Sequence, residues 1–402
     1  MSTNSRVARF VAVLSLGLPT IAIAGSPTKV YPTGFFPEDV SSVRAAVAQG
    51  GQVILEATDI SGMPTAFNFG PSVPGNGTVF LTTDVILSGT SAAGQRTTIM
   101  GGSAPIQVLS PIHFTIRGLQ FINPFDAAIN VEASRDAVIT DNVVENVVPA
   151  DQRDGTTEGF GIVVNSSSGP TSNITGNVVI ARNDIDGVPA DAGYGIVSAH
   201  HDANVIIEGN KVSNINLNGI LAGDISAHAF ILNNFVVPGP GTNPDFTSGN
   251  GIFVGHARGG RFSISNNTVI CDNIQADGIS VIASTELPVE GSSIVDNDVT
   301  MLGSLYGGVS LYDSPSHVLV ANNTIHGNGA YALQIAVAVS PPPSAIGNTF
   351  EDNSVADFSP ATSDVSLDIN AAETVLCNQP GTVVDNGIGT IVTARCPFLR
   401  AR

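Results

Sequence analysis

The feature of this 402-residue chain that most limits its possible folds is a pair of short phrases that recur along most of its length. One phrase has apolar residues, a polar residue, Asn and then a β-branched or aromatic residue, as in Ile139-Thr140-Asp141-Asn142-Val143. Further copies centre on Asn177, Asn210, Asn234, Asn267, Asn297, Asn323 and Asn348. A Gly-Ile or Gly-Val phrase precedes each of these later copies, at Gly161, Gly195, Gly219, Gly251, Gly278 and Gly308, with Ala332 in the last position. Repetition at this period predicts a solenoid.

The spacing of the phrases separates a constant part of each repeat from a variable part. The Gly phrase lies 15 or 16 residues before the following Asn in six of seven repeats, whereas the stretch from Asn to the next Gly phrase varies from 9 to 19 residues. The shortest repeat, Asn210 to Asn234, has 24 residues. β-branched residues recur at period two and no period of 3.6 persists, so each repeat is predicted to hold several short strands and not a helix pair.

The recurring Asn has a physical role in a stack of coils. Asn tolerates the left-handed conformation of a tight turn, and its amide can bond to the equivalent Asn about 4.8 Å away in the next coil. The Gly-Ile and Asn-x-β-branched phrases resemble the right-handed parallel β-helix repeats of the pectin-lyase-like superfamily over roughly residues 52–370. This resemblance implies an all-β, single-stranded right-handed parallel β-helix of about 10–12 coils.

The N-terminal residues predict an export signal followed by a cap. Arg6 and Arg9 precede an apolar stretch, Phe10 to Ala24, that ends in a small-x-small cleavage pattern, so residues 1–24 are expected to be a signal peptide. Within residues 25–51, valines at i, i+3 and i+7 predict an amphipathic helix from Glu38 to Ala48 that covers the first coil.

The C-terminal residues predict a closing segment after the β-helix of residues 52–370. The Asn phrase stops before residues 371–402, and Cys377 and Cys396 are expected to form a disulfide there in an oxidising compartment. Cys271 is left over in a strand-like run and is interpreted as a buried thiol.

The charge of the chain excludes some partners. Its 15 Lys and Arg against 34 Asp and Glu give a net charge of −19 without a basic cluster, which excludes nucleic acid. No apolar stretch long enough to span a membrane follows the expected signal. The expected signal peptide predicts a secreted or periplasmic protein. The resemblance to pectin-lyase-like β-helices implies a polysaccharide as substrate or ligand, and a capped solenoid is expected to be a monomer.

Superposition of the repeats on the Gly phrase reveals a column of candidate site residues five positions later. The column consists of Ser166, His200, Asp224, His256, Ala283 and Asp313. Because equivalent positions stack on adjacent coils, His200, Asp224 and His256 are expected within about 10 Å of one another. Tyr194, His201 and Asp202 flank this column, and Arg258 and Arg261 follow it.

Such a set suits proton abstraction from a uronic acid. His200, Asp224, His256 and Tyr194 would provide base and acid, while Arg258, Arg261, His201 and Asp202 would bind the substrate. The segment from Tyr194 to His200 resembles the Tyr-Gly…His motif of mannuronan C5-epimerases and related alginate-active β-helices, which implies a polysaccharide lyase or epimerase. The segment departs from that motif because Val197 stands where the family has Asp and because the His comes one residue late.

Two other interpretations remain open. The column can be an ordinary turn position, which favours Asp, Ser and Asn, and the chain can be a non-catalytic surface, matrix or carbohydrate-binding protein. The acidity of the chain disfavours polyanions and leaves neutral glycans open. The insertions Val148–Phe160, Val188–Tyr194 and Val237–Asn250 are predicted to form a wall beside a binding groove.

No cofactor is required by these patterns. A Ca²⁺ site is conceivable at Asn183-Asp184-Ile185-Asp186-Gly187, although Asn and Asp at turns are also explained by the repeat.

Overall fold

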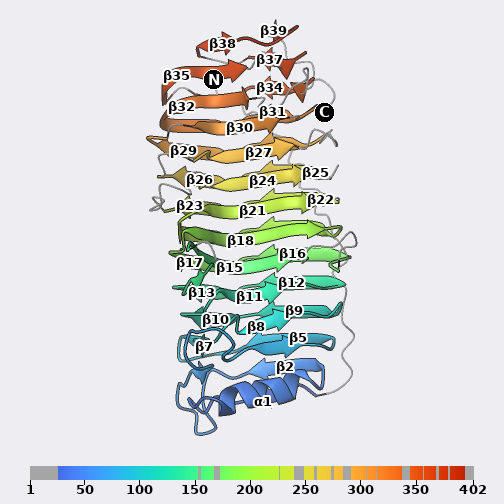
Figure 1. Ribbon diagram of the computed structural model, residues 1–402, viewed down its shortest axis with the longest axis vertical. Coiled ribbons are helices and arrows are strands. Elements are labelled where there is room, and N and C mark those ends of the chain that lie inside the picture. The colour runs from blue at the N-terminus through green and yellow to red at the C-terminus, as the bar shows by residue number, and fades with distance from the viewer. Residues whose placement is uncertain are drawn as a thin grey trace, which may run out of the picture.

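The computed structural model describes residues 26–152, 155–166, 173–225, 227–239, 249–257, 260–272, 276–283, 291–304, 306–313, 315–336, 345–355, 357–367, 371–378 and 381–393. Strands stack along one long axis with a single helix at one end (Figure 1). Almost every strand pairs in parallel with the strands one coil before and after it, which produces three ladders. The chain is therefore a parallel β-helix, as the repeat predicted.

The first sheet runs the length of the stack and has 14 strands. These are β1 (Thr28–Val30), β2 (Gly51–Leu55), β5 (Val85–Gly89), β9 (His113–Arg117), β12 (Asp136–Thr140), β16 (Asn177–Ala181), β19 (Asn204–Glu208), β22 (His228–Leu232), β25 (Arg261–Ser265), β28 (Ser293–Val295), β31 (Leu319–Ala321), β34 (Thr349–Glu351), β37 (Val375–Cys377) and β39 (Ile391–Thr393). β37 pairs in parallel with β34, and β39 pairs with β37, so the ladder of the first sheet includes residues beyond 370.

The second sheet follows the first in every coil. Its strands are β3 (Phe67–Asn68), β7 (Gln95–Met100), β10 (Leu119–Ile122), β13 (Val143–Glu145), β17 (Asp184–Val188), β20 (Lys211–Ile215), β23 (Phe235–Pro238), β26 (Thr268–Cys271), β29 (Asp298–Leu302) and the first part of β32 (Thr324–Ala336). β35 (Phe358–Leu367) continues from β32, and both strands run on into the third sheet.

The third sheet completes each coil. It contains β4 (Val79–Leu81), β8 (Ile106–Val108), β11 (Ala127–Val131), β15 (Thr157–Asn165), β18 (Ala192–His201), β21 (Asn218–Ile225), β24 (Ile252–Ala257), β27 (Ile279–Ala283), β30 (Gly307–Asp313) and β38 (Val383–Asp385), with the ends of β32 and β35. Four short strands lie outside the ladders: β6 (Ser91–Ala92) and β14 (Ala150–Asp151) form hairpins with β7 and β15, and β33 (Ala345–Ile346) pairs with β36 (Ala371–Ala372).

One face of each strand fills the interior of the coil. In β2 and β5, for example, Val53, Leu55, Val85 and Leu87 are completely buried while the residues between them are partly exposed. This is the period-two alternation expected of a strand with one face on a core. Helix α1 (Glu38–Val47) covers the end of the stack next to β2 (Figure 1), as predicted, with Val40, Val43 and Val47 buried.

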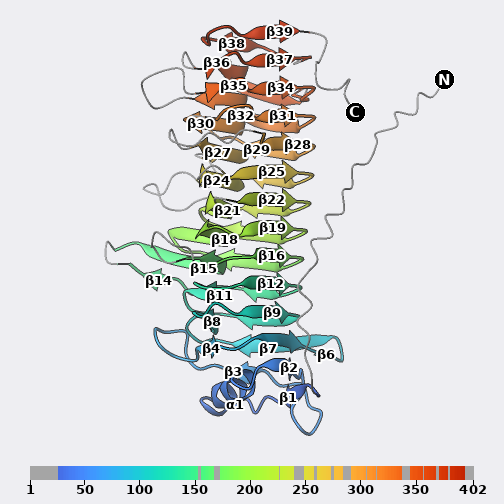
Figure 2. The ribbon, with the colours of Figure 1, turned by 90° about the vertical axis from the view of Figure 1, so that its right-hand side faces the viewer.

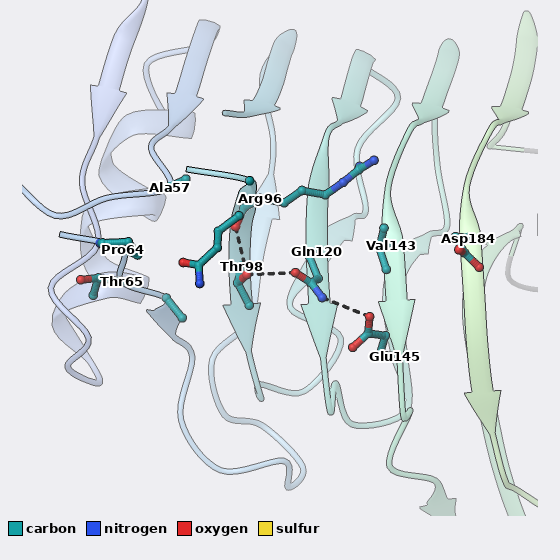
Figure 3. Close-up of a pocket in the computed structure, with 12 residues that line it drawn as sticks. Ala57, Pro64, Thr65, Arg96, Thr98, Gln120, Val143, Glu145 and Asp184 are labelled. Atoms are coloured by element: carbon teal, nitrogen blue, oxygen red, sulfur yellow. Dashed lines mark hydrogen bonds between the residues drawn. The ribbon is translucent and has the colours of Figure 1, made fainter. Parts of the chain in front are cut away.

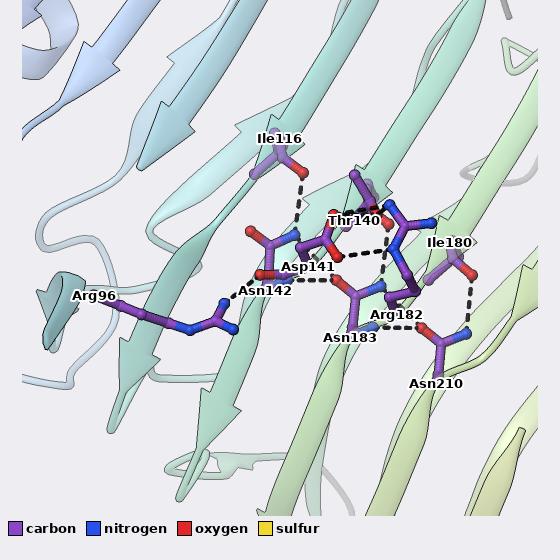
Figure 4. Close-up of polar contacts among 10 residues, drawn as sticks. Arg96, Ile116, Thr140, Asp141, Asn142, Ile180, Arg182, Asn183 and Asn210 are labelled. Carbon is purple, nitrogen blue, oxygen red and sulfur yellow. Dashed lines mark hydrogen bonds and ion pairs between the residues drawn. The ribbon is translucent and has the colours of Figure 1, made fainter. Parts of the chain in front are cut away.

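A ladder of buried amides joins the coils at the corner between the first and second sheets. Its members are Asn142, Asn183, Asn210, Asn234, Asn267, Asn297, Asn323 and Asn353. Each Nδ2 donates to the Oδ1 of the next Asn at 2.9–3.1 Å, and part of this ladder is visible in Figure 4. Each Nδ2 also donates to a backbone carbonyl one coil earlier, and each Oδ1 also accepts the backbone N–H of the preceding Asn, as at Asn210. In the six Asn residues between the two ends of the ladder, all four hydrogen-bonding positions of the amide are thus used.

The structure corrects the predicted members of this ladder in two places. Asn177 lies at the start of β16 and binds Asp136, and Asn183 takes the ladder position. Asn348 binds the carbonyl of Pro315, and Asn353 takes the last position. The left-handed residue of the turn is also not the Asn itself but the residue before it, such as Asp141 or Arg182. Asn177 and Asn348 were predicted in place of Asn183 and Asn353 because neighbouring turns have similar sequences rich in Ser, Asn and Gly.

The predictions about the signal peptide, the cysteines and membrane spans can be compared with the described residues. The expected signal peptide and Cys396 lie outside the described residues. Cys377 is disulfide-bonded, and Cys271 is a free, buried thiol whose pKa is raised by burial to about 12, in accord with the interpretation as an inert side chain. Within the described ranges, no helix is long and apolar enough to cross a membrane.

We predict that Asn234→Ala destabilises the fold strongly. The substitution leaves the backbone N–H and the Nδ2 of Asn210 without their acceptor in a buried site, which costs about 1–3 kcal/mol for each group. The free energy of unfolding, measured in urea, should fall by at least about 3 kcal/mol. Asn177→Ala is the control, because it removes an Asn of the same turn-rich region that is not in the ladder, and it should cost about 1 kcal/mol or less. Equal losses in the two variants would contradict the role of the ladder.

Candidate functional site on the third sheet

His200 and Asp224, two residues of the predicted column, are in contact on the surface. The Nε2 atom of His200 lies 3.0 Å from Oδ2 of Asp224 one coil later, and its Nδ1 atom lies 2.8 Å from Oδ1 of Asn165 one coil earlier. The imidazole side chain is 47% exposed. The prediction that stacking would bring His200 and Asp224 together is therefore confirmed.

The local backbone explains why these side chains point outward. His200 and Asp224 have φ values of 56° and 48°, the left-handed conformation of a sharp turn between the third and first sheets. Asp313, in the same column, has a φ of 66°. Both ring nitrogens of His200 face oxygen atoms, so neither is open to take a proton from a substrate in this arrangement. The contact can clamp three coils together and present an imidazole to a ligand.

His201 has to be removed from the predicted substrate-binding residues. It is only 1% exposed and points into the coil, where its Nε2 lies 2.9 Å from the Oγ of Ser198. Burial lowers the pKa of His201 to about 4. The correction has a simple cause, because the left-handed turn at His200 rotates the next side chain to the opposite face. His201 is thus a neutral core residue.

Tyr194 lies at the opposite end of β18 from His200. Six residues of extended strand place them about 20 Å apart, too far for one catalytic centre. The ring of Tyr194 stacks on Phe160 with centroids 5.3 Å apart and planes within 10°. Burial raises the pKa of the Tyr194 phenol to about 12, with a further contribution from the charge of Glu158. Tyr194 is therefore part of an aromatic surface and not of the His200 contact.

The aromatic pair belongs to an apolar strip on the outer face of the third sheet. Its buried members are Ala104, Ala127, Val163, Val197 and Ala199, and Phe160, Tyr194 and Leu221 pack against them. Outward-facing strand positions carry polar residues in most half-solvated sheets. Here the outward positions instead form a small second apolar cluster, in which five residues are buried and Phe160, Tyr194 and Leu221 are half-buried.

Of the remaining predicted residues, the structure describes the side chains of Arg261 and Asp202. Arg261 begins β25 on the first sheet, in register with His228, and is exposed. Asp202 is exposed in the turn after His201. The backbone of His256 lies in β24, but its side chain and the whole of Arg258 lie outside the described residues. That His256 and Arg258 lie near His200 therefore stays a prediction.

Asp277, which the sequence did not single out, forms a buried polar cluster at the edge of the third sheet. Its Oδ1 accepts the backbone N–H of Gly307 at 2.9 Å and the hydroxyl of Ser310 at 2.6 Å. Its Oδ2 accepts the phenol hydroxyl of Tyr312 at 3.0 Å, and Ser280 also donates to the carboxylate. Ser280, Ser310 and Tyr312 occupy outward-facing positions of β27 and β30.

The pKa of Asp277 is raised to about 6, and burial is the main cause. The hydrogen bonds from Ser310, Gly307, Tyr312 and Ser280 oppose that shift only in part. Burial and the neighbouring Asp277 charge also raise the pKa of Tyr312, which is partly exposed. The cluster thus holds a carboxyl that titrates near neutrality beside a phenol that reaches the surface.

The position of Asp277 in the repeat provides a signal that sequence reasoning missed. The residue directly before the Gly phrase is Asn218, Asn250 and then Asp277 in three successive coils. Asn218 and Asn250 each accept the backbone N–H of the next coil through Oδ1, at 3.0 Å. Asn therefore suffices for the structural task, and Asp277 adds a buried charge at a site where an amide would serve.

One predicted wall of the third sheet is present. β14 and β15 form a hairpin that projects from the side of the stack (Figure 2). Its base is fixed to the next coil by Asp191, whose Oδ2 accepts the N–H and the hydroxyl of Thr157 at 2.9 and 3.0 Å. The segment Val188–Tyr194 consists of the end of β17, a turn at residues 189–191 and the start of β18. Residues 240–248 of the third insertion lie outside the described residues.

The hypothesis of a Ca²⁺ site gains no support from the geometry. Asn183 is a member of the amide ladder, Asp184 pairs with Lys211 at 3.1 Å, and Asp186 accepts from Ser213 at 2.8 Å. Among the described residues there is no group of three or more His, Cys, Asp or Glu side chains arranged to hold a metal.

Comparisons with known proteins agree with this architecture. A family model described as "Right handed beta helix region" matches residues 246–395. The chain is a right-handed parallel β-helix. Sequence comparison with curated proteins finds no match.

Several solved structures resemble this β-helix at low identity. The A-module of the Azotobacter vinelandii mannuronan C-5 epimerase AlgE4 is 14% identical with a TM-score of 0.42, covering 89% of this chain and 94% of that one. PfbA, a surface adhesin of Streptococcus pneumoniae, is 12% identical with a TM-score of 0.49, covering 84% and 92%. A PL6 alginate lyase in complex with a trisaccharide is 10% identical with a TM-score of 0.44, covering 92% and 85%. This similarity concerns the fold alone.

We predict that His201 makes the β-helix less stable in acid. Its folded pKa of about 4 lies below the unfolded value of 6.5, so the unfolded chain binds the proton first as the pH falls. The stability that neutral His201 provides is complete above pH 6.5 and is lost towards pH 4, by about 3 kcal/mol. Urea unfolding from pH 7 to pH 4 should show this loss in the wild type and its absence in His201→Gln. A loss of the same size in both proteins would refute the assignment.

Asp277 should act in the opposite direction. Its folded pKa of about 6 lies above the unfolded value of 3.8, so its contribution is greatest below pH 3.8 and is lost as the pH rises through 6, by about 3 kcal/mol. Asp277→Asn keeps the acceptor for the N–H of Gly307 and has no charge to bury. Relative to the wild type, this variant should gain about 3 kcal/mol of unfolding free energy between pH 4 and pH 7. A constant difference across this range would mean that Asp277 is not the buried acid described.

Proposed function

We propose that this β-helix is an exported, polysaccharide-active enzyme that transfers a proton on the outer face of the third sheet, as a lyase or C5-epimerase does. The observation that carries the proposal is the hydrogen bond between Asp277 and Tyr312. A buried carboxyl that titrates near pH 6 beside a partly exposed phenol is the combination that acid–base catalysis requires.

The Asp277–Tyr312 pair supports a proton relay. As the C5–H bond of a uronic acid breaks, its proton passes to the phenol oxygen of Tyr312, and the phenol proton passes to Oδ2 of Asp277. The electron pair of the broken bond remains on the sugar as an enolate. In a lyase, the enolate expels the oxygen at C4, which takes a proton from water and leaves as a hydroxyl, and an unsaturated product forms. In an epimerase, the enolate takes a proton from water on the opposite face of the sugar, which gives the epimer. Asp277 is the final base, so its pKa governs the step.

The other features of the third sheet would hold the polymer. In the strand register, Ala199 beside His200 and Tyr312 are four coils apart in one column, which corresponds to about 19 Å along the axis. His200 with Asp224 would contact sugar hydroxyls at one point, and Phe160 with Tyr194 would contact an apolar sugar face. His256 and Arg258, on the coil of β24 and after it, remain proposed as the groups that meet a substrate carboxylate.

A second function is favoured by a specific observation. Both nitrogens of His200 are already engaged, and the Phe160–Tyr194 strip is apolar, which suits binding without chemistry. A non-catalytic β-helix that presents the third sheet to a surface or matrix glycan would have these features. It would not require the charge of Asp277.

We predict that Asp277→Asn abolishes turnover. Purified protein from residue 25 onward is incubated with polyuronates and with neutral glycans, and chain length, unsaturation and uronate configuration are followed. Loss of a general base lowers the rate by about 10²–10⁴-fold, and in the wild type the rate should rise as the pH increases through about 6. Tyr312→Phe should also lose activity, whereas His200→Ala should raise KM more than it lowers kcat.

The controls separate catalysis from binding and from folding. Asp313→Asn changes a carboxylate in the turn column after Tyr312 that has no contact with Asp277, and it should retain activity. Binding of a glycan with no product from any polymer would support the non-catalytic function and remove the enzyme proposal. Turnover that survives in Asp277→Asn would remove the proposed relay.

A further inference from the structure

A groove lies on the outer face of the second sheet, near the end of the stack that carries helix α1. It has a volume of about 550 Å³, and its lining includes Gln95, Arg96, Gln120, Val143, Glu145 and Asp184. Figure 3 shows its floor, formed by side chains of β7, β10, β13 and β17. Ligand pockets in proteins have volumes of about 300–1,000 Å³, so the groove is large enough for a small molecule or a short polymer segment.

Two segments make this part of the sheet concave. The loop with Pro64 and Thr65 stands on one side, and the β6–β7 hairpin places Arg96 on another (Figure 3). The guanidinium of Arg96 is fixed at one point, because its Nη1 donates to the carbonyl of Asp141 at 2.6 Å. The loop is held too, since Asp59 accepts hydrogen bonds from Ser61 and Met63. The walls are thus ordered by their own contacts.

A chain of hydrogen bonds orders the floor of the groove. The hydroxyl of Thr98 lies 3.2 Å from Oε1 of Gln120, and Nε2 of Gln120 donates to Oε1 of Glu145 at 3.1 Å. These residues stand on three successive coils, so the chain runs along the axis of the stack. It holds each side chain in one orientation and reduces the conformational entropy that a ligand would otherwise have to remove.

Several polar groups of the groove remain open to a ligand. Within the described part of the chain, Oε2 of Glu145 and the amide of Gln95 take no protein hydrogen bond, and Gln120 uses only one of its two amide hydrogens. Arg96 also lines the groove, and its guanidinium has donors besides the one that binds Asp141. Hydrogen-bond donors and acceptors therefore surround Val143, which lies at the bottom of the groove. A sugar presents such a pattern, because each hydroxyl both donates and accepts and the ring carbons offer an apolar face.

The charges of the groove indicate a neutral ligand. Arg96 is the one cation in its lining, and Glu145 and Asp184 are the carboxylates, with Asp184 also paired to Lys211 at 3.1 Å. A polyanion would meet no net positive field here, and the net charge of −19 repels it at longer range. A small cation would be attracted by the two carboxylates but repelled by the guanidinium of Arg96. A neutral polyhydroxylated ligand avoids both conflicts.

We propose that this groove binds a short segment of a neutral glycan, at a site separate from the third sheet. The second and third sheets are different faces of each coil, so the groove is independent of the Asp277–Tyr312 pair. Glu145, Gln120 and Arg96 contact sugar hydroxyls, and the ring lies against Val143. Through this site the β-helix binds a matrix or wall glycan, whether or not the third sheet is catalytic.

The test is binding of neutral tetrasaccharides to the full mature chain. Cellotetraose, maltotetraose, mannotetraose and galactotetraose are titrated by calorimetry and by saturation-transfer NMR, with a tetrauronate as the anionic comparison. At least one neutral probe should bind, and its affinity should change less than twofold between 50 and 500 mM NaCl because no ion pair is formed. Binding of the tetrauronate alone, or of no probe, overturns the proposal.

Variants place the bound sugar in the groove. Glu145→Ala and Gln120→Ala should each weaken binding at least tenfold, while Glu145→Gln, which keeps the hydrogen bond to Gln120 and loses the charge, should weaken it less than threefold. The matched control is Asp298→Ala, because Asp298 is an outward acid of the same sheet far from the groove. Unchanged affinity in Glu145→Ala would overturn the assignment.

The same titration separates this proposal from the proposed function. Asp277→Asn should bind the neutral probe as tightly as the wild type, and Glu145→Ala should keep its turnover on any polymer that the wild type converts. If Asp277→Asn abolished the binding of the neutral probe, the sugar would sit on the third sheet and the groove would be refuted.

Discussion

The buried amide ladder is the interaction on which the rest of this structure depends. Each ladder Asn carries two donor hydrogens and two acceptor positions into a buried site. Within the ladder, these groups are all satisfied only if the neighbouring coils supply identical amides at strand spacing. A shift of one residue in any coil would leave several of these groups unpaired, at about 1–3 kcal/mol for each. The ladder therefore fixes the register of all three sheets. The apolar core alone would not, because Val, Ile and Leu at period two tolerate a displacement by two residues.

The repeat made the fold, the cap helix and the corner with the amide ladder predictable from the sequence. Asn142, Asn210, Asn234, Asn267, Asn297 and Asn323 were placed correctly because a long-range pattern determines them. Asn183 and Asn353 were missed because a nearby Asn fitted the same phrase, and only hydrogen bonding between coils separates the two candidates. Side-chain direction at turns was similarly out of reach. His200 and His201 are adjacent in sequence, yet a left-handed φ at His200 places one on the surface and the other in the core.

The candidate site was predictable only in part, for a related reason. Stacking arguments correctly brought His200 next to Asp224, because both occupy the same position in their coils. These arguments compare equivalent positions in different coils, so they did not show that Tyr194 and His200 lie at opposite ends of one strand. Asp277 was overlooked because it stands where Asn218 and Asn250 stand, and its difference from them lies in burial and in partners from later coils. Sequence position alone does not report the protonation energy of a carboxyl.

The separations between neighbouring ladder Asn residues have a consequence for how this molecule can vary. They range from 24 residues, between Asn210 and Asn234, to 41 residues, between Asn142 and Asn183, while the hydrogen-bond length hardly changes. The longest of these intervals contains the β14–β15 hairpin, which leaves the stack between the second and third sheets. The coil therefore behaves as a frame that can be lengthened at one corner without any strain reaching the others. Insertions at that corner can therefore change the neighbouring surface, and each new loop affects the free energy of folding only where it leaves the coil.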